Sequence, residues 1–487
     1  MSSVRRSLAF SLADSYLGLV LQLASTLIIS RLLTPTEIGI FSVAAVLAAL
    51  ASTFRDFGVA EYLIQEKNLT PEKIRAALTA NIAISWLMAV LLFASSGAVA
   101  AFYRQPGIAE VMRILAVSFL LIPFGAVTMA YFRRELNYQP IFIAGLLANL
   151  TSFAVAVGAA LAGMGYLSLA WSSLAGVVVT VIVSVIARPK DFPRWPGLKG
   201  LRDVAQFGKH ASGIYFVGQI GKSAPEAVIG RALDMASVAF FSRANGLMEI
   251  FNKTVLRAAV PVCLPYFSQA ARANQETRVG YLKATSLLTG VGWPFFLYIG
   301  LVAYSTIRLL YGPQWMPSVP LAQILCFVAI LELPYYLAGE VMIAEGRVDQ
   351  SNRLQFLVQS LRLLSLVLAF PFGLTGVCWG LVGAALGGAC ISHRFLHRII
   401  GLRLIDAIRA YASSAYVALI SIMPPLLVIS YTGQTEENFL WVFVGCSLLM
   451  AVSWLCAIKF FGHPFWAEIT FITGKLKNRL SRKSESA

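Results

Sequence analysis

Long apolar runs constrain this chain more than any other feature of its sequence. Segments of about twenty mostly apolar residues recur along its whole length, and each could cross a hydrocarbon layer of about 30 Å as a helix. Of the 487 residues, 58% are hydrophobic and 13% are charged, whereas ordinary soluble domains have about 45 to 50% and about 25%. The sequence therefore predicts a polytopic membrane protein.

The membrane segments are expected to be helices, because backbone amides find no water partner in lipid and must bond within their own segment. We therefore predict an all-α protein with about 14 transmembrane helices. The spans are expected near residues 8–30, 36–54, 77–101, 109–131, 141–162, 165–187, 209–230, 236–261, 284–306, 319–343, 354–373, 375–393, 410–431 and 438–459.

The basic residues are distributed asymmetrically among the connections between these spans. If both termini are cytoplasmic, 29 of the 39 Lys and Arg fall in cytoplasmic stretches. The outer connections then hold only Arg31, Arg104, Arg231 and Arg308. Lys and Arg resist translocation, so this bias predicts both termini in the cytoplasm. It also accounts for the net charge of +16 without nucleic-acid binding.

Two stretches of the sequence, 29–50 and 229–250, resemble each other at a spacing of 200 residues. The identical pairs include Ile29 and Ile229, Arg31 and Arg231, Leu33 and Leu233, Phe41 and Phe241, Ser42 and Ser242, Ala44 and Ala244, and Leu47 and Leu247. A weaker echo relates IPF at 122–124 to LPY at 333–335. We interpret this as a duplication that gives two six-helix lobes in the same orientation, a transporter pattern.

The duplication suggests a division of the chain into four parts. These are an N-terminal lobe at 1–200, a C-terminal lobe at 201–400, two extra helices at 401–460 and a basic cytoplasmic tail at 461–487. The first helix of each lobe is poorly apolar, with Gln22 in one and Gln219 and Pro225 in the other. Interrupted segments at matching positions of two halves point to a transport site.

Ionisable residues inside the spans are the candidate functional residues, because each costs about 2.5 to 3.5 kcal/mol at the centre of a span. The candidate substrate ligands are the basic residues Arg243, Lys253, Lys222, Arg113, Arg257 and Arg362. The candidates for binding a coupling ion, H⁺ or Na⁺, are the acidic residues Asp14, Glu226, Glu249, Glu332 and Glu340. No catalytic residue, metal site or cofactor is predicted.

Span eight carries four of these charges on one face. At about 100° per residue, Arg243, Glu249, Lys253 and Arg257 fall within an arc of roughly 120° that must face the bundle interior. Structural ion pairs are the alternative interpretation, with Lys222 bound to Glu226 and Glu249 to Lys253. Arg113 and Arg257 lie near span ends, where snorkelling to lipid headgroups is the alternative.

Several motifs resemble one known family. SRLLTPTEIGIFSVA, RDFGVAEYLIQEKNLT, FYRQPGIAEVMRILA, YFRRELNY and GRALDMASVAFFSRA occur in this order. They are similar to the Wzx-type polysaccharide transporters of the multidrug/oligosaccharidyl-lipid/polysaccharide exporter superfamily. The resemblance implies a MATE/MurJ-like fold of fourteen helices and alternating access.

The same resemblance implies a function and a location. The expected substrate is a polyprenyl-pyrophosphate-linked oligosaccharide, flipped across a bacterial inner membrane for exopolysaccharide, capsule or O-antigen synthesis. A polysaccharide polymerase and a chain-length regulator are the expected partners, and a monomer is expected to suffice because two lobes already enclose one cleft.

Three alternatives remain open at this point. A drug or cation antiporter would favour a cavity dominated by carboxylates, whereas the basic candidates here outnumber the acidic ones. A flippase for lipid II, the lipid-linked peptidoglycan precursor, would share the same fold. A membrane polysaccharide polymerase or ligase would need a large outer loop, but the predicted outer connections are short. A transporter rather than an enzyme is therefore predicted.

Overall fold

The computed structural model describes residues 2–55, 58–193, 195–273 and 276–470. Side chains are described for these residues except 2–9, 11–12, 14–15, 205 and 207–217. All regular secondary structure in the described ranges is helical, as predicted. The chain divides into two compact units, unit 1 at Met1–Ala239 and unit 2 at Phe240–Ala487.

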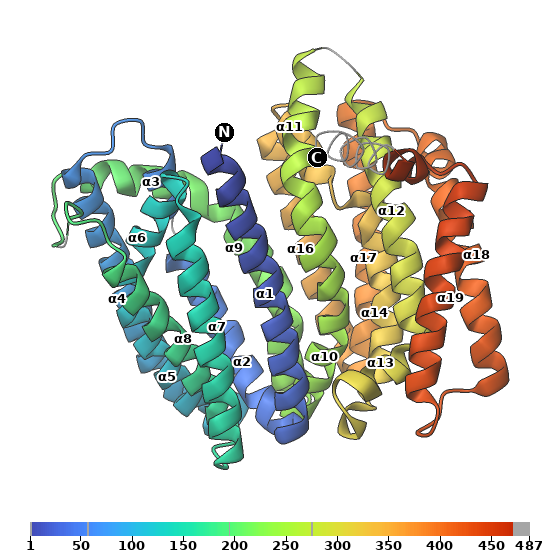
Figure 1. Ribbon diagram of the computed structural model, residues 1–487, viewed down its shortest axis with the longest axis horizontal. Helices are drawn as coiled ribbons and strands as arrows, with labels where there is room; N and C mark the ends of the chain where they lie inside the picture. Colours follow the sequence, from blue (N-terminus) through green and yellow to red (C-terminus); the bar gives the residue numbers. More distant parts are fainter. Residues whose placement is uncertain (1, 56–57, 194, 274–275, 471–487) are drawn as a thin grey trace, which may run out of the picture. The chain divides into compact units, whose positions relative to one another are not determined.

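Unit 1 consists of long antiparallel helices joined by short turns (Figure 1). Its helices are α1 Ser2–Leu32, α2 Pro35–Arg55, α3 Val59–Gln65, α4 Pro71–Tyr103, α5 Gly107–Leu121, α6 Pro123–Arg134, α7 Tyr138–Leu161, α8 Leu167–Ile186 and α9 Leu201–Ala232. It also includes the first residues of α10, Met235–Phe251, which continues into unit 2.

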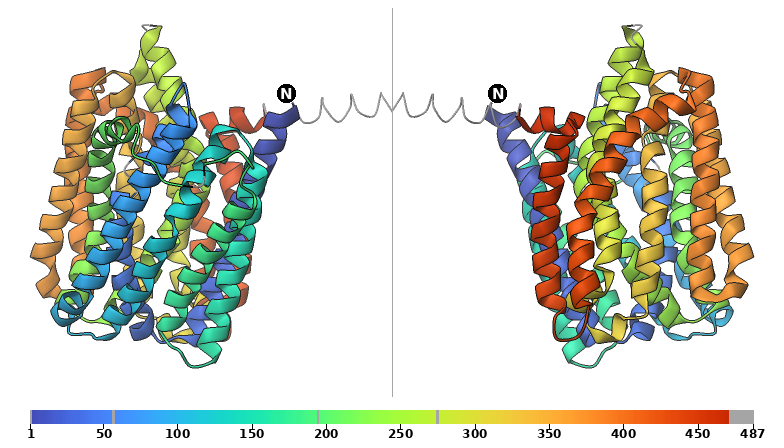
Figure 2. Two further views of the ribbon diagram at one scale, coloured as in Figure 1. Left: turned by 90° about the vertical axis from the view of Figure 1, so that its left-hand side faces the viewer. Right: turned by 90° about the vertical axis from the view of Figure 1, so that its right-hand side faces the viewer.

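Unit 2 begins in α10, which passes through a π-helical turn, Asn252–Leu256, into α11, Arg257–Arg272. The other helices of unit 2 are α12 Thr277–Leu301, α13 Ala303–Leu310, η2 Pro313–Trp315, α14 Ser318–Glu332, η3 Leu333–Tyr335, α15 Ala338–Ala344, α16 Val348–Ala369, η4 Phe370–Phe372, α17 Gly373–Ile400, α18 Leu404–Thr432 and α19 Phe439–Phe460. Figure 2 shows α11 and the start of α12 extending past their neighbours in this unit.

The described residues contain nine segments that are long and apolar enough to cross a membrane, and one bent pair of helices, α5 with α6, that passes the same test together. One of the nine segments, Val348–Ile400, comprises both α16 and α17. The protein is therefore a multi-pass membrane protein. The helices are compatible with the predicted fourteen spans, although α1, α9 and α10 are not among the nine segments.

The repeated sequence forms a helix–turn–helix twice, with a capping residue at the same position. Thr34 caps α2, because the Glu37 amide donates to Thr34 Oγ1 (3.3 Å) and the Thr34 amide donates to Glu37 Oε2 (2.8 Å). Asp234 occupies the equivalent position, 200 residues later, and caps α10: its Oδ1 accepts a hydrogen bond from the Ser237 amide at 2.7 Å. The duplicated stretches therefore conserve the signal that starts the second helix of each pair.

The weaker sequence repeat, IPF at 122–124 and LPY at 333–335, also corresponds to a repeated structural feature. Pro123 separates α5 from α6, which are bent by 53° relative to each other. Pro334 lies in the 3₁₀ turn η3 between α14 and α15. Proline removes a backbone donor and clashes with the preceding turn, so both interruptions have the same physical cause. Two residues after α6 and α15, Leu136 and Gly346 both adopt positive φ, 52° and 72°.

Glycines bring the two repeated stretches together within unit 1. A Cβ added to Gly39 on α2 would collide with the Met235 carbonyl oxygen, and one added to Gly230 on α9 would lie 2.9 Å from Val43 Cγ2. The Tyr103 hydroxyl of α4 donates to the Ala227 carbonyl at 3.2 Å. Both α2 and α4 therefore pack closely on α9.

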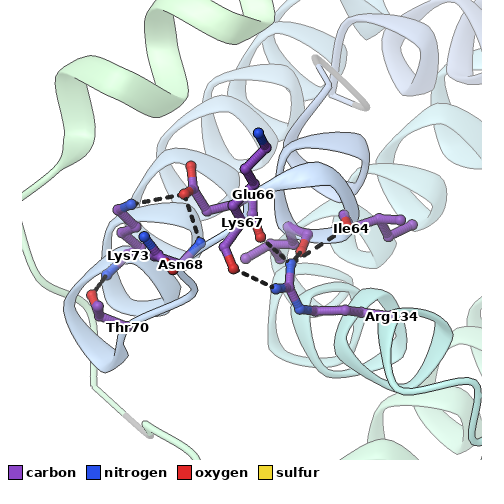
Figure 3. Close-up of polar contacts among 8 residues, drawn as sticks. Ile64, Glu66, Lys67, Asn68, Thr70, Lys73 and Arg134 are labelled. Carbon is purple, nitrogen blue, oxygen red and sulfur yellow. Dashed lines mark hydrogen bonds and ion pairs between the residues drawn. The ribbon is translucent and has the colours of Figure 1, made fainter.

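The stretch that sequence analysis treated as a connection before span three contains a short helix, α3 (Figure 3). Arg134, at the end of α6, donates to the carbonyls at the end of this helix. The acceptors are the oxygens of Leu63 (2.8 Å), Glu66 (2.5 Å), Ile64 (3.4 Å) and Lys67 (3.4 Å). The last carbonyls of a helix have no partner within it, so this guanidinium stabilises α3.

A salt bridge next to this cap joins α3 to the next membrane helix. Lys73 Nζ lies 2.9 Å from Glu66 Oε1, and this hydrogen bond lowers the pKa of the Glu66 carboxyl. Thr70 caps α4 by accepting the Lys73 amide at 3.4 Å (Figure 3). The motif residues of this region therefore have a clear structural role.

Candidate functional site

Arg243 lies on an aromatic platform inside unit 2. Its guanidinium carbon is 5.4 Å from the centre of the Tyr311 ring and 5.2 Å from the centre of the Trp315 ring. Tyr311 is 5% exposed and Trp315 is 0% exposed, whereas Arg243 is only partly buried. Distances of this size, below about 6 Å, define cation–π contacts. The sequence analysis selected Arg243 by its charge but did not identify its two aromatic neighbours.

The platform depends on the backbone between α13 and η2. Gly312 has φ 101° and ψ 178°, a region that is essentially restricted to glycine, and it turns the chain so that Trp315 lies beside Tyr311. The Trp315 ring packs edge-on against Tyr311 at 6.3 Å and against Phe240 at 6.0 Å. These edge-to-face contacts fix the indole plane that Arg243 covers.

The turn between α18 and α19 holds α13 in place. Gln434 bridges the break between α12 and α13, because its Oε1 accepts from the Ser305 amide (3.2 Å) and its Nε2 donates to the Leu301 carbonyl (2.9 Å). Arg308 on α13 donates through Nε to Glu436 Oε2 at 2.6 Å. This hydrogen bond lowers the pKa of the Glu436 carboxyl. The two extra C-terminal helices therefore brace the segment that carries the platform.

The other charges of the eighth predicted span surround a π-helical turn. Lys253 lies within this turn, and Arg257 follows it with an exposed side chain. A π turn bonds residue i to i+5, so a wheel drawn at 100° per residue does not describe this helix beyond Asn252. The Glu249 carboxylate accepts a hydrogen bond from the side-chain amide of Asn252 at 3.0 Å. Within the described residues, Glu249 and Lys253 do not form the ion pair considered from the sequence.

The candidates on α9 and α1 differ in what the structure describes. Lys222 is exposed and Glu226 is partly buried, and no ion pair joins them in the described part of the chain. Gln219 donates to Ser223 Oγ at 3.1 Å one turn along the same face. The side chain of Asp14 lies outside the described residues.

Arg113 lies on an exposed face of α5 that also carries the exposed apolar residues Val117 and Leu120. Its guanidinium is 5.8 Å from the Phe93 ring centre, and its Nε donates to Ser96 Oγ at 3.3 Å. Both contacts are to α4, so Arg113 is held against the neighbouring helix.

The remaining three candidates lie in unit 2, away from the platform in sequence. Arg362 Nη1 lies 3.9 Å from Glu332 Oε1, at the limit of an ion pair. Glu332 is exposed, and Glu340 on α15 is partly buried. The structure therefore brings one predicted acid, Glu332, beside one predicted base, Arg362.

A guanidinium presents N–H donors in a planar fork that matches phosphate or carboxylate oxygens, so Arg243 is a candidate ligand for an anion. Among the described residues, no three His, Cys, Asp or Glu side chains converge to hold a metal ion.

Comparison with solved structures identifies the fold. The fold is similar to that of the lipid II flippase MurJ in an inward closed conformation, with a TM-score of 0.74 and 13% sequence identity. The similarity covers 95% of this chain and 100% of the MurJ chain. The fold is therefore MurJ-like, as the sequence analysis predicted.

Comparison of sequences identifies the family. A family model described as "Polysaccharide biosynthesis protein" matches residues 28–320, more than half of the chain. The protein belongs to this family. It is 27% identical over 434 residues to the teichuronic acid biosynthesis protein TuaB of Bacillus subtilis, covering 85% of this chain and 84% of TuaB. It is 25% identical over 330 residues to the succinoglycan biosynthesis transport protein ExoT of Rhizobium meliloti, covering 66% of this chain and 65% of ExoT.

Proposed function

We propose that this protein flips polyprenyl-pyrophosphate-linked oligosaccharides across the bacterial inner membrane for the synthesis of exopolysaccharide, capsule or O-antigen. The observation that carries the proposal is the match to the polysaccharide biosynthesis family over residues 28–320 in a chain with a flippase-like fold. The names of TuaB, a teichuronic acid biosynthesis protein, and ExoT, a succinoglycan biosynthesis transport protein, support a glycan substrate.

The physical problem for such a protein is the pyrophosphate. Moving an unpaired anion into a medium of low dielectric constant costs tens of kcal/mol by Born solvation. A pathway lined with cations reduces this cost while the polyprenyl tail stays in lipid. We propose that Arg243, Lys253 and Lys222 are the principal ligands of the headgroup. Arg243 has the strongest structural support, because its guanidinium is held on Tyr311 and Trp315.

The other charged candidates have secondary roles in this proposal. Arg257 and Arg362 are weaker headgroup ligands, and Arg113 is the weakest because it shares an exposed apolar face. We propose that a carboxylate inside the membrane segments binds the coupling ion, H⁺ or Na⁺. The candidates for this role are Asp14, Glu226, Glu249, Glu332 and Glu340.

Transport is proposed to occur by alternating access of two lobes, residues 1–200 and 201–400, with both termini in the cytoplasm. The helix pairs that begin these lobes have the same caps, which supports a duplicated mechanism. The protein would work as a monomer and hand its product to a polysaccharide polymerase with its chain-length regulator.

The test is a flipping assay with the purified full chain in proteoliposomes. The substrate is a fluorescent polyprenyl-pyrophosphate oligosaccharide, and parallel arms contain lipid II or a cationic dye. We expect transport only of the oligosaccharide, and loss of it in Arg243→Ala. Arg231→Ala is the matched control, since Arg231 also stacks on a ring, Phe102, at 5.0 Å but is not a proposed ligand.

Each outcome of this assay has a defined meaning. Transport of lipid II or of the dye in place of the oligosaccharide would replace the proposed substrate. Normal oligosaccharide transport by Arg243→Ala would remove Arg243 from the site. A protein that transports none of the three substrates, although it is folded and inserted, would contradict the flippase proposal itself.

A further inference from the structure

The aromatic platform in unit 2 brings Tyr311 and Trp315, from the connection between predicted spans 284–306 and 319–343, to Arg243 of span 236–261. Trp315 is fully buried and Tyr311 is nearly so, and both rings lie within cation–π distance of the same guanidinium. Neither residue belongs to the charged set that the sequence selects. Their burial shows that they do not form an interfacial aromatic belt, which places rings at the headgroup level.

Contact with two aromatic rings restricts the arginine side chain. A free arginine side chain has about 2 kcal/mol of rotamer entropy, much of which is lost when it binds an anion. Two rings within 5.4 Å of the guanidinium carbon impose part of this restriction before the anion arrives. Preorganisation of this kind increases affinity by reducing the cost of binding.

The platform is itself rigid, because it is fixed from two directions. Phe240, one turn before Arg243 on α10, packs edge-on against Trp315 at 6.0 Å. On the other side, the α18–α19 turn fixes α13 through Gln434 and through the 2.6 Å bond from Arg308 to Glu436. Trp315 therefore cannot easily rotate away and release Arg243.

We infer that Tyr311 and Trp315 are positioning residues, which hold the Arg243 guanidinium with its N–H edge directed toward the pyrophosphate of the transported lipid. The inference rests on the proposed function, since it concerns how the headgroup ligand is prepared. It also assigns a role to the extra helices α18 and α19: they stabilise the segment that carries the two rings.

The test measures binding of inorganic pyrophosphate to the full chain in nanodiscs by titration calorimetry. Loss of a cation–π contact of about 0.5 to 2 kcal/mol corresponds to affinity weakened roughly 2- to 30-fold. We expect Trp315→Leu to approach the upper limit and Trp315→Phe to fall between it and the native protein. Tyr311→Leu should weaken binding, whereas Tyr311→Phe should retain it because the ring remains.

A double-mutant cycle separates positioning of Arg243 from a general structural role. In the Arg243→Ala background, Trp315→Phe should have no further effect on pyrophosphate affinity, because the residue acts through the arginine. Trp466→Phe is the matched control, since Trp466 lies 5.8 Å from Lys459 in another cation–π pair. The control should bind pyrophosphate as the native protein does.

The possible failures are distinguishable. If Arg243→Ala weakens binding but every variant of Tyr311 and Trp315 binds within 2-fold of the native protein, the positioning role is wrong and the proposed site remains. Equal effects of Trp315→Phe with and without Arg243 would also contradict it. If the native protein does not bind pyrophosphate, or if Arg243→Ala binds it normally, the failure lies in the proposed headgroup site. Tyr311→Leu and Trp315→Phe keep the test valid if Trp315→Leu does not fold.

Discussion

The Arg134 cap allows a direct test of how a family motif stabilises the fold. Arg134 closes the end of α3 by donating to four carbonyls, and two of these bonds are short, to Leu63 (2.8 Å) and Glu66 (2.5 Å). Arg134→Ala removes all four bonds and leaves the rest of α6 unchanged. Arg133→Ala is the matched control, because this neighbouring arginine is exposed.

The expected magnitude follows from the two short bonds. A hydrogen bond to a charged group contributes about 1.5 to 3 kcal/mol, and Arg134 is only partly buried, so its two short bonds together contribute about 3 kcal/mol. The bonds to Ile64 and Lys67, both 3.4 Å, add little. Since about 1.4 kcal/mol corresponds to a factor of ten, opening of α3 should become roughly 150-fold more frequent.

Hydrogen exchange measured by mass spectrometry reports this opening directly. Peptides covering Val59–Gln65 should exchange roughly 150-fold faster in Arg134→Ala, while peptides from α7 and α8 should be unaffected. Arg133→Ala should change exchange by less than a factor of three, because exposed substitutions usually cost under about 0.5 kcal/mol. If both variants exchange alike, the carbonyl bonds do not hold α3 and the reasoning is wrong.

Three further predictions concern the repeated turns and the brace. Gly39→Val should cost about 1 to 3 kcal/mol of folding stability and so lower the thermal unfolding midpoint, because the larger side chain forces α2 away from Met235. Gly97→Val is the control and should leave the midpoint unchanged, because an added Cβ at Gly97 meets nothing within 4 Å. Asp234→Ala should remove the cap of α10, cost about 0.5 to 2 kcal/mol and accelerate exchange of the Ser237 amide. The hydrogen bond from Arg308 lowers the pKa of the Glu436 carboxyl. The contribution of this ion pair to folding stability is therefore fully present above the ordinary pKa of 4.5 and is lost as the pH falls through the lowered pKa. The difference in unfolding midpoint between the native protein and Glu436→Gln should therefore vanish in acid.

The features that the sequence predicted well are those that depend on neighbours along the chain. An apolar run identifies a membrane helix because its own residues must satisfy the bilayer, and Tyr138–Leu161 and Phe439–Phe460 are long, apolar helices as expected. The breaks at Pro123 and Pro334 depend on one residue each. Where the pattern was weaker, as in α9, the composition alone did not establish a span.

The features that the sequence did not predict depend on contacts between distant segments. Arg243 and Trp315 are 72 positions apart in the numbering, and only the turn at Gly312 brings the indole beside the guanidinium. The cap that Arg134 forms on α3 likewise joins segments about seventy residues apart. The helical wheel of span eight was too simple because a π-helical turn interrupts it at Asn252–Leu256. Charge alone therefore selected residues without revealing which of them are held in place.

Comparison of the two repeats separates residues that build the fold from those proposed for transport. At a shift of 200, the caps correspond, since Thr34 aligns with Asp234. The charged candidates have no charged counterpart, because Arg243 aligns with Val43, and Glu249 and Lys253 align with Ala49 and Thr53. In the first copy, Val43 is fully buried against Gly230. An apolar side chain therefore packs at the position that Arg243 occupies in the second copy. This difference between the copies supports the proposal that Arg243 serves the substrate, because a charge in a membrane segment costs free energy.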